Sequence, residues 1–364
     1  MTESSWLCRD RISGTSRSAG DAPCYAGPAM AKRTLVSLLL LVAAGISTPV
    51  ISEQSGPSDE LVSGNGFVQK ARESSDIMAP GSPAFVLVAR VKLTERKQEL
   101  QGVYASSWAG PSRFRRILNF GDFTETDVAS GNEIFKKRTT KAIPLLIWEL
   151  DTMMESFVRR QLSGEWKVAR AAGEQREGDT VECMTLREEK NSIFACADRA
   201  SGDISSIELG HERKGSFRGK YEFFDYRAFG DKRFPWRIKY SGWAGRRIEI
   251  NVEKLTQVRS FVESEFTPLA GSMRFGYCGG AEAVTTFADA GPGRTPPFFD
   301  RVDAVVYLEI GPDGRVRQAS MLDSSSPVDN AEILEWFTGA AYPMRVCGGK
   351  NYAYETLLKF AGMR

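Results

Sequence analysis

The last fifth of the chain most constrains the fold, because a strand, a tight turn, a second strand, a helix and a third strand follow one another there. Residues 304–310 alternate apolar and polar side chains, as a half-buried strand does. Residues 311–315 contain Pro, Asp and Gly, which favour a compact reversal, and residues 316–322 follow as the return strand. This order predicts a small β-β-α-β module.

A helix is predicted after Pro327. Asp329 is expected to cap its N-terminus, with Glu332 three residues later as in a capping box. The helix ends before Pro343, and its apolar residues share one face, which consists of Ile333, Leu334, Phe337, Ala340 and Ala341. In the final strand alternate residues lie on one side, and these are Tyr352, Tyr354, Thr356, Leu358 and Phe360.

This segment, about residues 298–364, resembles the TonB C-terminal domain. The resemblance rests on the turn 311–316 (Gly-Pro-Asp-Gly-Arg-Val), the step 322–327, the helix start 329–331 and the closing strand 354–360. It implies a module that adds a partner's extended peptide to its sheet, because an exposed edge offers unpaired N–H and C=O groups. The five alternating residues of the final strand would form that edge, and the partner would be an outer-membrane or other envelope protein. An unrelated small α+β domain is the alternative.

Residues 30–52 have the composition of a secretory signal peptide. Lys32 and Arg33 precede the apolar stretch 35–45, which is well short of the ~20 residues that cross a bilayer as a helix. We therefore expect a periplasmic or envelope-associated protein after cleavage. If the segment is retained, it would anchor the chain in the inner membrane. Residues 1–29 lack apolar periodicity and are interpreted as a disordered leader or a mis-called start.

Export would place the chain in an oxidising compartment, where an even number of cysteines favours disulfides. The cysteines that follow the signal segment are Cys183, Cys196, Cys278 and Cys347. Cys183 and Cys196 face each other if residues 180–188 and 191–200 form a hairpin, because every residue pair then has the same register. Cys278 is left to pair with Cys347, although four cysteines allow three pairings.

Length and composition set broad limits on the protein. The 364 residues are 42% hydrophobic and carry a formal net charge of +2. The chain after the signal segment is long enough for two globular domains. Its small net charge excludes a protein that binds polyanions over its whole surface. Residues 53–80 are poor in aromatic side chains and rich in Ser and Gly, and are predicted to be a linker.

Between residues 81 and 264, runs typical of β-strands are interrupted once, by a helix predicted over 143–163. Its apolar residues recur at helical spacing and are Leu146, Leu150, Met153, Met154 and Phe157. Strands are expected on both sides of this helix, because the flanking segments alternate apolar and polar residues between turns rich in Gly.

This layout resembles the lipoprotein-carrier group, relatives of LolA and LolB. The resembling segments are 108–117, which begins Trp-Ala-Gly-Pro, and 224–238 with 248–252. The resemblance implies a strongly curved antiparallel half-barrel around a helix plug, with an apolar cavity for acyl chains lined by the five helix residues. A plain core role for this stripe of Leu and Met is the alternative.

Residues 213–247 combine 11 Lys or Arg with three acidic residues and many aromatic side chains. This pattern is typical of long strands with charges outside and aromatics inside, and the alternative is a surface for anionic lipid. Nucleic acid is not an expected partner.

No chemistry of metals or catalysis is predicted. The single histidine, His211, has no nucleophile pattern near it, and Cys pairs at zinc spacing are absent from the sequence. No cofactor is therefore expected. Asp122, Glu125 and Asp127 are interpreted as one face of a short strand, where they would hold a cation or form a solvated edge.

The sequence therefore predicts an α+β protein with a half-barrel over 81–264 and a β-β-α-β module over 270–364. We expect a non-enzymatic exported protein that binds a lipid-like ligand in the half-barrel and makes protein contacts through the module. A TonB-type energy transducer with an uncleaved anchor is the alternative, although the chain lacks a long Pro-rich spacer. A secreted hydrolase is a third hypothesis.

Overall fold

A computed structural model describes residues 64–154, 167–171, 180–188, 191–209, 219–277 and 302–360. The chain divides into a unit of residues 1–56 and a unit of residues 57–364, and every described residue belongs to the second. The predicted leader and signal peptide lie outside the described residues. In the part that is described, no helix is long and apolar enough to cross a membrane.

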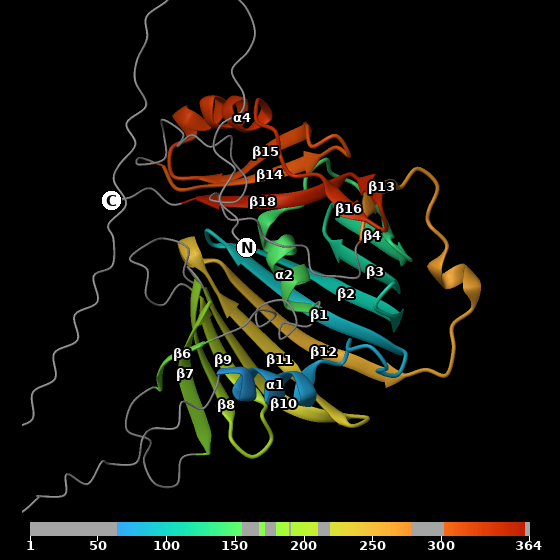
Figure 1. The fold of residues 1–364 in the computed structure, drawn as a ribbon, viewed down its shortest axis with the longest axis vertical. Helices are drawn as coiled ribbons and strands as arrows, with labels where there is room; N and C mark the ends of the chain where they lie inside the picture. The colour runs from blue at the N-terminus through green and yellow to red at the C-terminus, as the bar shows by residue number, and fades with distance from the viewer. Residues whose placement is uncertain are drawn as a thin grey trace, which may run out of the picture. The chain divides into compact units, whose positions relative to one another are not determined.

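Most of the described chain forms one antiparallel sheet of thirteen strands, in the order β13-β5-β4-β3-β2-β1-β12-β11-β10-β9-β8-β7-β6. The strands are β1 (Phe85–Glu95), β2 (Gln98–Gly110), β3 (Arg113–Phe120), β4 (Phe123–Ser130), β5 (Glu133–Arg138), β6 (Lys167–Ala171), β7 (Val181–Glu188), β8 (Asn191–Asp198), β9 (Ile204–Leu209), β10 (Gly219–Phe229), β11 (Lys232–Ser241), β12 (Arg247–Gln257) and β13 (Met273–Gly276). The strand direction turns steadily from β4 to β6 (Figure 1), as right-handed twist requires. Among the described strands β13 and β6 are edges, so the sheet is open.

The centre of this sheet is a long-range pairing that hairpins alone do not give. β1 pairs with its neighbour in sequence, β2, on one side and with β12 on the other. Side chains alternate along β1, so that Phe85, Leu87 and Ala89 are buried while Arg90 is exposed. The predicted alternation of strands over 81–264 is therefore found in the structure as one half-buried sheet.

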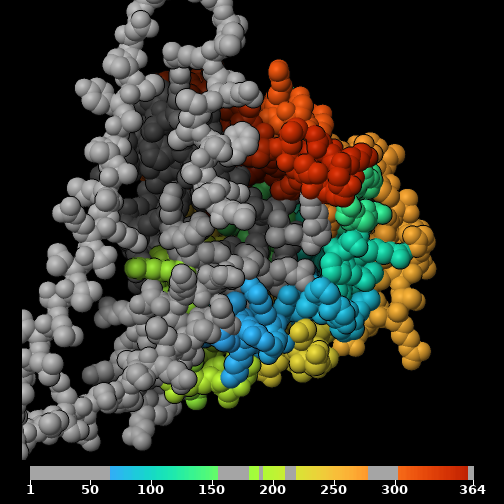
Figure 2. All heavy atoms as spheres, viewed as in Figure 1, coloured from blue at the N-terminus to red at the C-terminus, as the bar shows by residue number. Residues whose placement is uncertain are grey.

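Among the described residues two short helices accompany the sheet, and two 3₁₀ turns, η1 (Trp243–Gly245) and η2 (Glu263–Phe266), follow later. Helix α1 (Gly64–Ser75) lies in the stretch predicted to be a linker, and there the prediction is wrong. It buries Phe67, Val68 and Ala71 and leaves a polar side at the surface, where Figure 2 shows it in blue. The sequence signal was weak because a short helix with few apolar residues resembles a polar linker.

Helix α2 (Leu145–Met154) is the predicted helical interruption. The expected helix extended to residue 163, but residues 155–166, including Phe157, lie outside the described part of the chain. Figure 1 shows α2 in front of β1 and β2.

Residues 302–360 form what we call the C-terminal module, with a three-stranded sheet in the order β15-β14-β18. Its elements are β14 (Ala304–Ile310), β15 (Val316–Ser324), η4 (Pro327–Asp329), α4 (Asn330–Thr338), β16 (Arg345–Cys347), β17 (Lys350–Tyr352) and β18 (Tyr354–Phe360). One face of the three strands packs on α4, with Ile333 and Phe337 fully buried there. The β-β-α-β order agrees with the predicted one, while the resemblance to the TonB C-terminal domain stays a prediction.

Three details of the module differ from the prediction. Asp329 makes no side-chain capping bond, because the 3₁₀ turn η4 leads the chain directly into α4. The final strand is split, so that Tyr352 belongs to β17 and pairs with Arg345 in β16. The segment from residue 270 was assigned to the module, but its strand β13 pairs with β5 of the large sheet.

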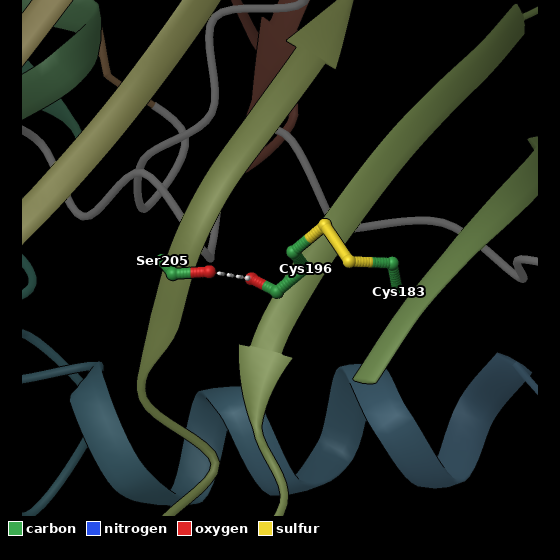
Figure 3. Close-up of a disulfide and its surroundings, with 3 residues drawn as sticks. All are labelled: Cys183, Cys196 and Ser205. Carbon is green, nitrogen blue, oxygen red and sulfur yellow. Dashed lines mark hydrogen bonds between the residues drawn. A yellow bond between two sulfur atoms is a disulfide. The ribbon is translucent and has the colours of Figure 1, made fainter. Parts of the chain in front are cut away.

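The hairpin of β7 and β8 has the predicted register, and Cys183 pairs directly with Cys196. The two cysteines form a disulfide (Figure 3), and the Ser205 hydroxyl of β9 donates to the Cys196 carbonyl at 3.2 Å. This prediction is confirmed. Cys347 is also disulfide-bonded. Its predicted partner, Cys278, lies outside the described residues, so the pairing of the two stays a prediction.

We expect non-reducing peptide mapping of the mature protein to recover Cys183–Cys196 and Cys278–Cys347. The double variant Cys183→Ala/Cys196→Ala should lower the free energy of unfolding by about 3 kcal/mol, because a short closed loop restricts the unfolded chain. Urea unfolding measures this loss. Free thiols or crossed pairs in the peptide map would contradict the assignment.

Candidate functional site

One face of the large sheet, which we call the inner face, carries the side chains that contact α2. It is lined by buried aromatic residues from strands β1, β2, β3, β10 and β11. These are Phe85, Tyr104, Trp108, Phe114, Phe120, Tyr221, Phe223, Phe229, Phe234 and Tyr240. Phe85 stacks on Trp108 with ring centroids 5.3 Å apart, and Tyr221 lies 4.9 Å from Tyr240. The inner face is therefore a continuous apolar layer that spans the paired strands.

Helix α2 is buried on every side. Nine of its ten residues are buried, among them the predicted cavity residues Leu146, Leu150, Met153 and Met154. These four belong to the same apolar cluster as the inner face. A helix that is apolar all round lies within a core, whereas a surface helix keeps one polar face. The structure thus brings four of the five predicted residues to the inner face.

Two acidic residues interrupt this apolar helix, and each has its own cationic partner. Glu149 forms an ion pair with Lys359 of the C-terminal module, and the Tyr221 hydroxyl donates to it at 3.5 Å. Burial raises the pKa of Tyr240, and the nearby charge of Glu149 raises it further. Asp151 lies 2.6 Å from the guanidinium of Arg116 on β3. The two carboxylates therefore tie α2 to two different parts of the fold.

Where β3, β4 and β5 meet, the inner face changes from apolar to ionic. Arg116 lies 2.6 Å from Asp127 of β4, and Lys136 of β5 lies 2.9 Å from Glu355 of the C-terminal module. Arg138 of β5 pairs with Glu355 and, at 3.2 Å, with Glu125. We call this group the inner-face charge cluster, and it comprises Arg116, Glu125, Asp127, Lys136, Arg138, Asp151 and Glu355.

The pKa values of the two neighbouring carboxyl groups of β4 are shifted in opposite directions. Desolvation, reinforced by the charge of Asp127, raises the pKa of Glu125 to about 8. Desolvation also acts on Asp127, but Lys136 and Arg116 outweigh it and hold the pKa of that carboxyl below its ordinary value. Burial therefore favours the neutral form of Glu125, while the neighbouring cations favour the charged form of Asp127.

This result corrects the prediction for the three acidic residues. Asp122 lies in the exposed turn before β4 and does not share a face with the other two. Glu125 and Asp127 are buried and surrounded by cations, so they form neither a cation site nor a solvated edge. Among the described residues, no group of acidic, Cys or His side chains is arranged to hold a metal ion.

The structure also locates the predicted partner edge, whose use by a partner stays a prediction. β18 pairs with β14 alone among the described strands, which makes it an edge of the small sheet. Its residues Tyr354, Thr356 and Leu358 are nonetheless buried, and two of them pack in the apolar cluster of α4. Side chains at this edge are thus occupied within the module.

The basic and aromatic stretch 213–247 follows the simpler of its two interpretations where it is described, from residue 219 on. Its aromatic residues Tyr221, Phe223 and Phe234 are buried at the inner face, while Lys220 and Arg237 are partly exposed. Arg237 stacks on Phe224 with 4.7 Å between guanidinium and ring. His211 lies outside the described residues.

Comparisons with known proteins add only distant likenesses. No family model matches the chain. No curated protein matches it. A LolA superfamily protein from Nitrosomonas europaea has 11% identity and a TM-score of 0.37, covering 57% of this chain and 98% of that chain. An outer membrane lipoprotein-sorting protein domain from Vibrio parahaemolyticus has 12% identity and a TM-score of 0.39, covering 55% and 94%. A DUF1329 family protein from Desulfovibrio piger has 8% identity and a TM-score of 0.38, covering 56% and 96%. Because these scores are low, the functional proposals rest on the contacts described above.

The buried Glu125 predicts a pH dependence of stability. Its pKa rises from 4.5 to about 8 on folding, so between these values only the folded protein binds the proton. This contribution to stability is full below about pH 4.5 and is lost as the pH rises to about 8. In the wild type, this loss of unfolding free energy is on the order of a few kcal/mol. It should be absent from Glu125→Gln, whose side chain is neutral at every pH.

Urea unfolding between about pH 5 and pH 8 measures this difference. Glu253→Gln, on the partly exposed outer end of an ion pair with Arg90, is the matched control and should keep the wild-type slope. A Glu125→Gln variant whose stability falls with pH as steeply as the wild type would contradict the assignment.

Proposed function

We propose that the chain is a non-enzymatic envelope protein that binds a lipid-like ligand at the inner face of its large sheet, against α2. The observation that carries the proposal is the apolar inner face together with a helix buried on all sides. An acyl chain needs an apolar surface and no hydrogen-bonding partner along its length. The aromatic layer and the Leu and Met side chains of α2 supply that surface.

The dimensions of the elements support this proposal. Thirteen strands spaced by about 4.8 Å extend for about 60 Å across the sheet. The ten residues of α2 make a helix of only about 15 Å. One short helix therefore covers a small part of the inner face, and a modest displacement of it would expose apolar area on both elements.

The side chains of α2 suit such a displacement. Met153 and Met154 are unbranched and polarizable, so they adapt to surfaces of different shape, including an acyl chain. The segments that resemble the lipoprotein-carrier group also contribute to this surface, since Trp108 and Phe114 lie on the inner face. We infer that the ligand chain would lie along α2.

The proposed compartment is the periplasm or the envelope, after removal of residues 30–52. The C-terminal module would then serve protein contacts, and energy transduction would require a retained membrane anchor. N-terminal sequencing of protein purified from the envelope tests this proposal. A mature end near Glu53 is expected, and an intact segment 30–52 would favour the transducer instead.

The ligand proposal predicts a selective effect of polarity on α2. Met153→Gln keeps the size of a side chain that is 2% exposed and places an amide in the proposed acyl site. We expect at least a fivefold loss of copurifying lipid by mass spectrometry, because a buried amide without a partner costs about 1–3 kcal/mol. Circular dichroism checks that the variant is folded.

Ile117→Gln is the matched control, because Ile117 lies on the opposite face of β3 and is 38% exposed. It should retain lipid at the wild-type level. A wild-type protein that copurifies no lipid and binds no added long-chain fatty acid would refute the proposed function. Equal lipid loss in both variants would refute the placement of the ligand at α2.

A further inference from the structure

Among the described residues, ionic contacts connect the C-terminal module to the large sheet and to α2 at three buried or partly buried places, and a more exposed pair joins Lys350 to Glu133. Asp323 of β15 pairs with two arginines of the sheet, Glu355 of β18 enters the inner-face charge cluster, and Lys359 of β18 pairs with Glu149 of α2. Four buried apolar module residues, Val305, Tyr307, Ala353 and Leu357, belong to the main core. The contact is therefore a small apolar centre with charges around it.

Asp323 is held at two neighbouring turns of the large sheet. Its carboxylate accepts a hydrogen bond from Arg96 at 3.0 Å and another from Arg246, and Glu95 accepts one from Arg246 at 2.8 Å. We call Glu95, Arg96, Arg246 and Asp323 the Asp323 cluster. The side chain of Asp323 is 4% exposed, although the group comes from two separate sheets. Arg246 also stacks on Trp243, 4.8 Å from its ring.

The two turns of the Asp323 cluster contain non-glycine residues with positive φ, a backbone conformation that is energetically unfavourable. Arg96 and Lys97 between β1 and β2 have φ of 47° and 74°, and Ala244 between β11 and β12 has φ of 58°. Among the described non-Gly residues only Asp225 also has a positive φ. Such conformations cost about 1–2 kcal/mol each and persist where the surroundings fix them. The module's carboxylate is one of the groups that fix these turns.

Glu355 is among the most deeply buried charged residues in the described part of the chain. Its side chain is 1% exposed, and it receives Lys136 and Arg138 from β5 and the Tyr307 hydroxyl of β14 at 2.5 Å. Next to it the Gly276 amide of β13 donates to the Ala353 carbonyl at 2.8 Å. The module therefore supplies an anion that the inner face of β5 needs.

We propose that the C-terminal module is an intramolecular lid over α2 and the inner face, and that the Lys359–Glu149 pair transmits its opening to α2. The inference rests on the proposed function for the nature of the ligand. It adds a path by which the ligand enters. When the module moves away, the Lys359–Glu149 pair breaks, so that α2 is released and the inner face is uncovered. The ligand site would then be regulated from the module.

The chemistry of the contact suits a separable lid. Buried ion pairs contribute little net stability, because the energy of removing both charges from water offsets their attraction. When the module separates, Asp323, Glu355 and Lys359 regain hydration, so opening costs less than separation of an apolar interface of equal area. The same ion pairs define one docked position of the module, because they form together only when the module lies in that position.

Native-state hydrogen exchange on the mature full chain tests this coupling without any ligand. Lys359→Gln should raise the exchange rates of the α2 amides by about fivefold or more, since contacting residues in one ion pair are energetically coupled. Exchange in β8 and β11 should stay at the wild-type rate. The double variant Glu149→Gln/Lys359→Gln should exchange no faster than the faster single variant.

A second variant distinguishes opening of the module from a purely local effect of losing the Lys359–Glu149 pair. Asp323→Asn weakens the Asp323 cluster, in which the ion pairs of Asp323 are with Arg96 and Arg246 of the large sheet and not with α2. A lid nonetheless predicts faster exchange in α2. Arg90→Gln removes an ion pair on the outer face, where Arg90 is 76% exposed, and is the control. Wild-type α2 exchange in both Lys359→Gln and Asp323→Asn, or an equal increase in Arg90→Gln, would overturn the proposal.

Uptake of a pyrene-labelled long-chain fatty acid distinguishes the lid from the ligand proposal. Lys359→Gln should take up the probe several-fold faster than wild type, and Arg90→Gln at the wild-type rate. If α2 exchange responds but no variant binds the probe, the ligand proposal fails and the coupling of the module to α2 stands. If the probe binds at equal rates and α2 exchange is unchanged, the lid proposal fails and the ligand proposal stands.

Discussion

Charge balance in the inner-face charge cluster is the constraint on which the assembly of this fold depends. The inner face of β3, β4 and β5 carries three cations, Arg116, Lys136 and Arg138, and one charged carboxylate, Asp127. Burial favours the neutral form of Glu125, whose pKa is raised to about 8. In that form the cations of these strands outnumber their charged carboxylates. Among the described residues, Asp151 of α2 and Glu355 of the module bring further negative charges to these cations.

This balance explains why α2 and the module occupy their positions. An unpaired buried charge costs several kcal/mol, so the inner face of β3–β5 cannot be buried by apolar residues alone. These negative charges come from the helix that follows β5 and from the C-terminal module, in addition to Asp127 of β4. Buried pairs of this kind add more to the specificity of an arrangement than to its stability. The large sheet therefore selects which helix and which strand lie on it.

The sequence predicted the elements of local origin. Alternation gave the strands of the large sheet, and the register of one hairpin placed Cys183 opposite Cys196. The pairing of β1 with β12 could not be predicted, because local sequence patterns do not relate residues that are more than a hundred positions apart. Helix α1 was missed because its apolar residues are few, and Asp329 was misassigned because a capping pattern does not exclude a preceding 3₁₀ turn. These errors arise where tertiary contacts decide between local options.

The positions of the charged residues along their strands already indicate which face they occupy. Arg116 has the same parity in its strand as Phe114 and Leu118, so alternation already places it on the buried side. Lys136 likewise shares the parity of Ile134. A cation at an inner position requires an anion from elsewhere in the fold, and the acidic residues of an otherwise apolar helix, such as Asp151, are natural candidates. A basic residue at an inward-facing strand position therefore predicts a contact with an acidic residue from another element. The identity of that acidic residue follows only from the structure.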